Sequence, residues 1–137
     1  MSQENVQPLY AIGAFRMVGG LSTWLTPNLL ARVYGGTRPD AAALLWSRLG
    51  GSREIALGVG PMVSEGEARR RWLLFGLACD FGDMAATLLV VNRRRGDRLS
   101  PFGAGLAMAT YSVSALLTGW ALRSSRAEAL EAAGRSE

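Results

Sequence analysis

Four apolar stretches of about 20 to 23 residues constrain this chain more than any other feature. They cover residues 9–31, 41–63, 72–91 and 101–122. A helix rises about 1.5 Å per residue, so about 20 apolar residues are needed to cross the hydrocarbon core of a bilayer. The pattern therefore predicts an all-α, antiparallel bundle of four transmembrane helices within a single membrane domain, residues 1–137. Residues 123–137 form a polar tail, either frayed helix or disordered.

The segments between these stretches are short and polar, as connections between neighbouring helices should be. Residues 34–40 form a turn that ends at Asp40, a typical N-cap, while residues 64–71 and 92–98 are charged loops. Short links place consecutive helices side by side in antiparallel order. A soluble bundle would need a polar face on every helix, and the fourth stretch contains no charged residue at all.

The charged residues are bunched rather than spread along the chain. All 15 basic residues are arginine, and the formal net charge is +4. The arginine runs lie between apolar stretches, where they would meet lipid headgroups rather than nucleic acid. No basic segment precedes the first stretch, so a cleaved signal peptide is not expected. We expect a multi-pass protein of a bacterial inner (plasma) membrane, because the Ala-, Gly- and Arg-rich usage is typical of GC-rich bacterial genomes.

Each stretch carries small and polar residues three or four positions apart, which places them on one helix face. Small residues allow membrane helices to approach closely, and polar ones form bonds between them, so these faces should point inward. The four faces consist of Gly13, Arg16, Gly20, Thr23 and Pro27; Arg48, Gly51, Glu54, Gly58 and Pro61; Gly76, Asp80, Asp83 and Thr87; and Gly103, Ala107, Tyr111, Ser114 and Thr118. The glycine pairs at 19–20 and 50–51 are read as close-packing positions.

Charged groups on these faces lie at similar depth, roughly 10 to 17 Å from one membrane surface at about 1.5 Å per residue. The groups in this band are Arg16, Arg53, Glu54, Asp80, Asp83 and Tyr111, with Arg48 nearer the opposite surface. An unpaired charge near the bilayer centre costs at least about 2–3 kcal/mol. Three arginines face three carboxylates, so the sequence predicts a balanced cluster that includes Arg48.

Two interpretations of this cluster remain open. Asp80 and Asp83, three residues apart, could share a proton and act with Glu54 as catalytic acid and base. The same groups could instead be a salt-bridge network that holds the helices in register. Arg16 and Arg53 could bind an anionic group of a ligand or act as counter-ions, and Tyr111 could donate a proton or bond a neighbouring helix. We expect Cys79 to be inert, and we expect no metal and no cofactor, because no His is present and arginines surround the carboxylates.

Three segments resemble a known family. They are Gly51-Ser52-Arg53-Glu54-Ile55-Ala56-Leu57-Gly58, Asp80-Phe81-Gly82-Asp83, and Arg16-Met17-Val18-Gly19-Gly20 with Pro27 and residues 31–35 behind it. Together they are similar to a bacterial and fungal family of small four-helix membrane proteins whose domain has no assigned function. The resemblance implies that architecture and the relevance of Arg53, Glu54 and Asp83, but it implies no reaction. Glu54 stands where the family more often has Asp.

Three functions are compatible with this pattern. The first is binding of a lipid-like or apolar small molecule, or of a partner in a membrane complex or a second copy of the chain. The second is a membrane-embedded acid/base enzyme, such as an isomerase, a cyclase or an epoxide-opening enzyme. The third, which we rank lowest, is a small proton-coupled transporter whose carboxylates relay the proton.

Overall fold

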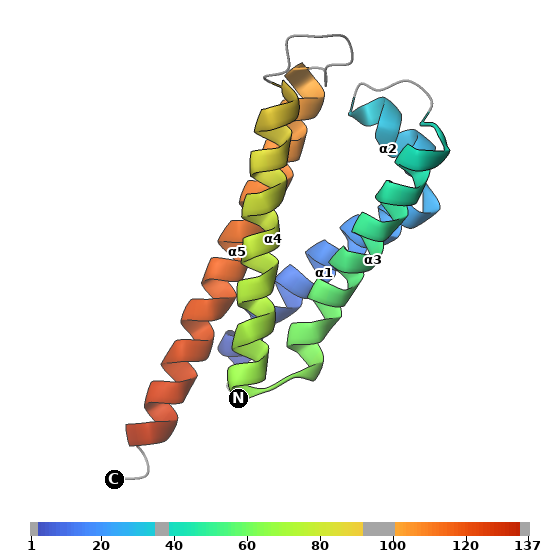
Figure 1. The fold of residues 1–137 in the computed structure, drawn as a ribbon. Coiled ribbons are helices and arrows are strands. Elements are labelled where there is room, and N and C mark those ends of the chain that lie inside the picture. The colour runs from blue at the N-terminus through green and yellow to red at the C-terminus, as the bar shows by residue number, and fades with distance from the viewer. Residues whose placement is uncertain (1–2, 35–38, 92–100, 135–137) are drawn as a thin grey trace.

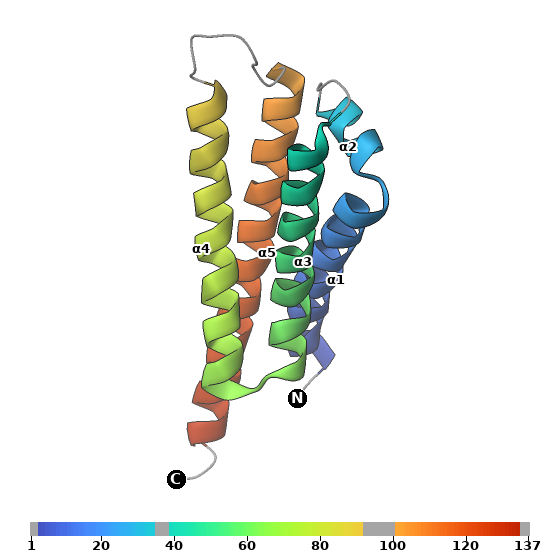
Figure 2. The same ribbon diagram turned by 45° about the vertical axis from the view of Figure 1, so that its right-hand side comes forward.

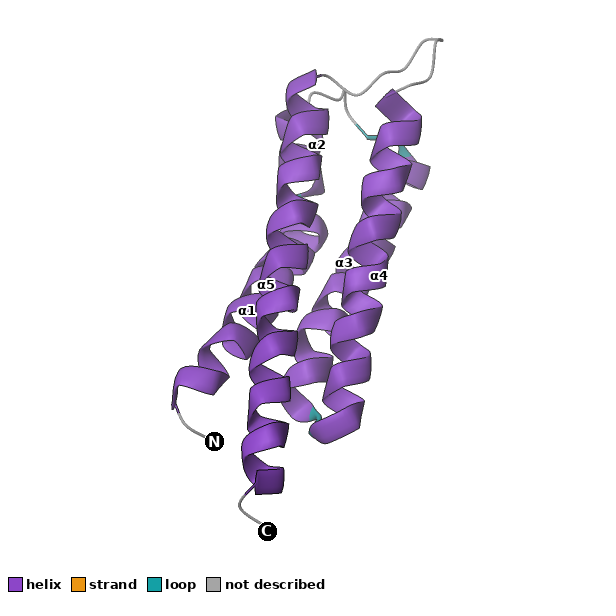
Figure 3. Cartoon of the chain, turned by 90° about the vertical axis from the view of Figure 1, so that its left-hand side faces the viewer, coloured by secondary structure: helices purple, strands orange, loops and turns teal. Residues whose placement is uncertain are grey.

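The computed structural model describes residues 3–34, 39–91 and 101–134, with side chains for residues 7–34, 39–91 and 101–126. Within these ranges helices are the only regular secondary structure, as Figure 3 shows. The helices are α1 (Gln3–Leu25), α2 (Pro27–Val33), α3 (Ala41–Val63), α4 (Gly66–Val91) and α5 (Pro101–Gly134). The predicted helical class is therefore confirmed, while the predicted loop at residues 92–98 lies outside the described residues.

The four long helices lie side by side (Figure 2), with one pair tilted against the other (Figure 1). Helix α1 pairs with α3, and α4 pairs with α5. The two pairs approach each other at the end where α3 joins α4 and diverge towards the other end, where α2 lies (Figure 1). Because α1 also contacts α5 and α3 also contacts α4, the helices form a four-membered ring that is tight at one end only.

The first apolar stretch is broken, which corrects the prediction of one helix over residues 9–31. Thr26 leaves the helical conformation with φ −130° and ψ 46°, and α2 begins at Pro27. Proline has no N–H to donate, and its ring disfavours a helical residue before it. The carbonyl of Thr23, which an N–H at position 27 would have bonded, instead accepts the hydroxyl of Ser47 on α3 at 3.4 Å. The break turns α2 across the open end of the helix pairs (Figure 1).

The other helix bounds follow capping chemistry and helix propensity. Asp40 caps α3 as predicted, accepting the N–H of Ala43 at 2.7 Å. Helix α4 begins at Gly66, so the loop predicted over residues 64–71 is confirmed for residues 64–65 and wrong for residues 66–71. Arginine and alanine are good helix formers, and the side chain of Arg69 donates from Nε to the carbonyl of Ser64 at 2.9 Å.

Helix α5 also exceeds its predicted length. It was expected to leave the membrane at residue 122, but it continues as helix to Gly134. Of the two alternatives for the tail, frayed helix or disorder, the structure describes helix over most of it. Hydropathy reports only where apolar residues stop, whereas the Ala- and Glu-containing sequence after residue 122 still favours a helix.

The buried core is small and lies at the tight end. It consists of Ile12, Leu73 and Ala121, with Leu117 and Leu122 packed against it. In contrast, large apolar side chains are exposed along all four long helices. Two helical segments, Gly66–Val91 and Pro101–Arg126, are long and apolar enough to cross a membrane, whereas α1 and α3 do not reach the same apolar composition.

Candidate functional site

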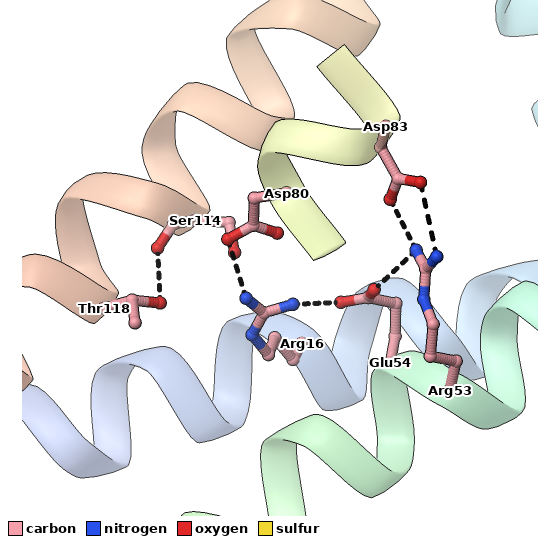
Figure 4. Close-up of polar contacts among 7 residues, drawn as sticks. All are labelled: Arg16, Arg53, Glu54, Asp80, Asp83, Ser114 and Thr118. Atoms are coloured by element: carbon pink, nitrogen blue, oxygen red, sulfur yellow. Dashed lines mark hydrogen bonds and ion pairs between the residues drawn. The ribbon is translucent and has the colours of Figure 1, made fainter. Parts of the chain in front are cut away.

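Arg16, in the middle of α1, is the centre of a buried ionic network. Its side chain is only 2% exposed. One guanidinium nitrogen, Nη1, donates to Glu54 Oε2 on α3 at 2.6 Å, and the other, Nη2, donates to Asp80 Oδ2 on α4 at 2.7 Å (Figure 4). Gly76, one turn before Asp80, provides the space, because a Cβ there would lie 2.9 Å from Nη2. A single arginine therefore ties three helices together.

Arg53 forms a second, more open ionic group. It donates to both carboxylate oxygens of Asp83 on α4 and to Glu54 Oε1 at 3.1 Å (Figure 4). Bidentate arginine–carboxylate pairs of this kind are the strongest and most directional ion pairs in proteins. The Arg53 side chain is 41% exposed, so the pair borders open space rather than the packed interior.

Glu54 joins the two groups, because each of its oxygens binds a different arginine. The result is a chain of alternating sign across three helices, Asp80–Arg16–Glu54–Arg53–Asp83. The predicted meeting of these five residues is therefore confirmed. With every group ionised, three carboxylates and two guanidinium groups carry a net charge of −1.

Arg48 does not belong to this network, contrary to the predicted charge balance. It is exposed on α3, with its guanidinium carbon 5.8 Å from the ring centre of Trp24. Arg48 lies six residues before Glu54, which at about 100° per residue places it about 120° around the helix. Cation–π contact with Trp24 takes the place of a carboxylate partner.

Asp80 and Asp83 face the interior but do not form the carboxylate pair of the acid/base interpretation. They lie about 60° apart around α4, and each binds a different arginine. Neither therefore resembles one half of an aspartate dyad sharing a proton. Arg16 and Arg53 act as counter-ions in this structure, and Cys79, which is partly buried beside Asp80 in the sequence, forms no disulfide.

Helix α5 contributes polar groups to the same region. Thr118 Oγ1 bonds the carbonyl of Ser114 at 2.8 Å. Ser114 is 3% exposed, and its own hydroxyl lies beside Asp80 (Figure 4) without a hydrogen bond of ordinary geometry to any described residue. Its proton can turn towards Asp80, but its oxygen accepts no hydrogen bond from a described residue, so Ser114 is a position where a bound group could donate one.

A cavity of about 950 Å³ opens between the diverging helix pairs, and the ionic network borders it. The charged and hydroxyl groups that line it include Arg16, Arg53, Glu54, Asp80, Asp83, Thr110, Tyr111 and Ser114. Its remaining lining is mostly apolar and comes chiefly from α1, α2 and α3, including Phe15, Val18, Leu30, Trp46 and Leu49. Such a combination, an apolar cleft with a few convergent polar groups, is typical of a small-molecule site.

Two glycines that were predicted to be close-packing positions instead form part of the cavity wall. Gly20 and Gly51 are close-packing positions as predicted, since a Cβ on Gly20 would lie 2.6 Å from the Gly51 carbonyl. Their neighbours Gly19 and Gly50 are not: both line the cavity, with nothing within 4 Å of an added Cβ. A pair of adjacent glycines with a turn of roughly 100° between them could have indicated two different roles.

Among the described residues, no group of three or more acidic, cysteine or histidine side chains is placed to hold a metal ion. Comparison of the chain with models of protein families, with curated proteins and with solved structures finds no match. The resemblance to the four-helix family of unassigned function thus stays a prediction.

Proposed function

We propose that the protein spans the membrane four times and holds a small, largely apolar molecule in the cavity beside its ionic network. The distribution of polarity supports this proposal. Arg16, Asp80 and Thr118 are buried, whereas apolar side chains face outward on every long helix. A soluble monomer rarely exposes large contiguous apolar surfaces, because water disfavours them. Lipid removes that cost and instead disfavours polar groups on the outside.

The low apolar content of α1 and α3 is compatible with spanning. Their central charges, Arg16 and Glu54, reduce the average, yet both are bonded within the bundle. Charged residues within membrane helices commonly face the bundle interior and pair with one another. The outer surfaces of these helices carry Leu21, Leu25, Leu45 and Val63, which are all exposed and do not line the cavity. Only Arg48 and Arg53 are charged and exposed within the span of α3, and Arg53 borders the cavity.

The cavity itself is the observation that carries the binding proposal. At about 950 Å³ it lies within the range of about 300–1,000 Å³ that ligand sites commonly occupy. Its walls are apolar over most of their area, so an apolar body would be bound by burial of its surface. One region is charged, so a polar end of the same molecule could be oriented there.

Blocking the cavity tests this proposal. Gly19→Leu and Gly50→Leu place a side chain in the cavity where an added Cβ meets nothing, so the helices need not move. Gly105→Leu is the matched control, because Gly105 on α5 is equally open but does not line the cavity. Native mass spectrometry of protein extracted with its surrounding lipid would report bound molecules and the number of chains in each particle.

We expect a bound small molecule in the wild type and in Gly105→Leu, and its loss from both cavity variants with the helical content unchanged. Retention in the cavity variants, or empty wild-type protein, would contradict the proposal. Wild-type particles that contain a second protein and no small molecule would instead favour the role of a subunit in a membrane complex.

Acid/base catalysis is the second candidate, and Tyr111 is the observation that favours it. Its phenol lines the same cavity as Glu54 and Asp83, so a proton donor and two carboxylates could reach one substrate. Against it, both carboxylates are already bound to arginine. An enzyme would convert the molecule recovered from the cavity, and Asp83→Asn would abolish the conversion; unchanged turnover in that variant would exclude this role.

A further inference from the structure

We propose, on the basis of the binding function above, that the molecule in the cavity carries a protonated amine that docks at Asp80 and Ser114. The inference concerns the chemical class of the ligand. It follows from the charge of the ionic network, from the hydrogen bonds that each of its members makes, and from the buried hydroxyl of Ser114 beside Asp80.

The network has one negative charge too many. Three carboxylates face two guanidinium groups, and Arg48, the cation expected to balance them, lies exposed against Trp24. An uncompensated charge in a region of low dielectric constant is strongly disfavoured. A cation in the cavity would remove this imbalance, whereas an anion would increase it.

The hydrogen bonds show where the imbalance is greatest. Glu54 and Asp83 each accept bonds from arginine on both of their oxygens. Asp80 accepts an ionic bond on Oδ2 alone. Among the described residues, Oδ1 of Asp80 has no ionic partner, so it is the carboxylate oxygen in the network best able to accept another charged donor.

Ser114 provides the second acceptor. Ser114 lines the cavity, and its hydroxyl is buried beside Asp80, so its proton can turn towards that carboxylate while its lone pairs accept no hydrogen bond from a described residue (Figure 4). A hydroxyl oxygen accepts hydrogen bonds, and an ammonium group donates up to three. An ammonium head placed here would satisfy Asp80 and Ser114 together, while the apolar walls formed by Phe15 and Val18 would cover its hydrocarbon part.

Three probes with the same chain and different heads test this inference: dodecylamine, dodecanol and dodecanoate. Each would be titrated into the protein in nanodiscs of zwitterionic lipid, with occupancy read by native mass spectrometry. Gly19→Leu, with the cavity blocked, gives the non-specific binding to subtract. We expect dodecylamine to bind about 10 to 100 times more tightly than dodecanol, the effect of roughly one charge-assisted hydrogen bond. Dodecanoate should bind most weakly.

Two variants assign the preference to the proposed site. Ser114→Ala should weaken dodecylamine several-fold and leave dodecanol unchanged, whereas Ser124→Ala, which removes an exposed hydroxyl on the same helix, should change neither. Asp80→Asn should abolish the preference for the amine. Because Ser114→Ala removes a single oxygen and leaves the ion pair of Asp80 with Arg16 in place, it should leave the fold intact even where Asp80→Asn does not.

The outcomes separate this inference from the function on which it rests. Binding of dodecanol or dodecanoate at least as tight as that of dodecylamine would overturn the amine and leave the cavity a binding site, its extra charge neutralised by a proton. An amine preference that survives in both Ser114→Ala and Asp80→Asn would also overturn it. Failure of all three probes to bind the wild type above the level of Gly19→Leu would contradict the binding function itself.

Discussion

Arg16 binds two carboxylates from two other helices while almost fully buried, so its removal would leave both anions without their shared partner. Breaking a buried ion pair in this way typically costs about 3–5 kcal/mol, because a desolvated charge remains. We therefore expect Arg16→Met to lower the free energy of unfolding by about that amount. Titration of the protein in mixed micelles with sodium dodecyl sulfate would measure the loss.

Arg71 offers the matched control. It is exposed on α4 and lies 3.6 Å from Glu67, one turn away. Exposed pairs of this type contribute about 0–1 kcal/mol, so Arg71→Met should unfold almost as the wild type does. Equal losses in Arg16→Met and Arg71→Met would show that the buried network does not stabilise the bundle.

The spacing of charged residues predicted most of this network, and its failures have a geometric cause. Arg16, Glu54 and Asp80 lie at matched depth on inward faces, so their meeting followed from the rise per residue. Arg48 and the Asp80–Asp83 pair were misjudged because steps of three residues fall about 60° short of a full turn. Repeated steps of three residues therefore rotate side chains progressively away from the face where the series began. Which partner each charged side chain meets then depends on the adjacent helices and cannot be read from its own helix alone.

At the scale of the helices, glycine determines how closely α1 and α3 approach. An added Cβ on Gly51 would lie 2.7 Å from the Gly20 carbonyl and would collide with the side chain of Thr23. The obstructing carbonyl belongs to a helix backbone and cannot turn aside. We expect Gly51→Ala to destabilise the protein by about 1–3 kcal/mol, the usual cost of overpacking.

Gly50 is the adjacent control for this test. It lies in the same helix, but an added Cβ there would meet nothing within 4 Å. Replacing a helical glycine by alanine without a clash typically stabilises by about 0.5–1 kcal/mol. Gly50→Ala should therefore be neutral or stabilising in the same detergent titration. A loss in Gly50→Ala as large as that in Gly51→Ala would argue against close packing as the cause.

Helix bounds were predictable where one local signal dominates. Asp40 marked the start of α3, and the observed limits, Ala41–Val63, match the predicted stretch. The break at Thr26 was missed because Pro27 fell on the inward face of the first stretch and was read as part of a continuous helix. The starting point of α4 was missed because hydropathy detects apolar residues rather than helix, and Arg69 to Arg71 are helical.

For the whole molecule, an arginine, an aspartate and three hydroxyl side chains are buried, while large apolar side chains are exposed on every long helix. The sequence could predict this distribution, since its small and polar faces, apart from Arg48, did turn inward. It could not predict that the helix pairs diverge, because the angle between them depends on packing along their whole length. The cavity is a consequence of that divergence and was not foreseen.

The four-span proposal requires α3 to cross the membrane despite its charges. Arg53 and Glu54 of the ionic network belong to α3, so the network can lie within the bilayer only if α3 spans it. Single cysteines at Ala41 and Glu65, at either end of α3, would be placed in a Cys79→Ser background. Labelling by a membrane-impermeant maleimide would then be compared in right-side-out and inverted vesicles. Cysteines at Glu67 and Val91 provide the reference, because they mark the ends of α4, which is apolar enough to span. We predict that Ala41→Cys and Glu65→Cys are labelled from opposite sides; labelling of both from the same side would contradict the four-span bundle.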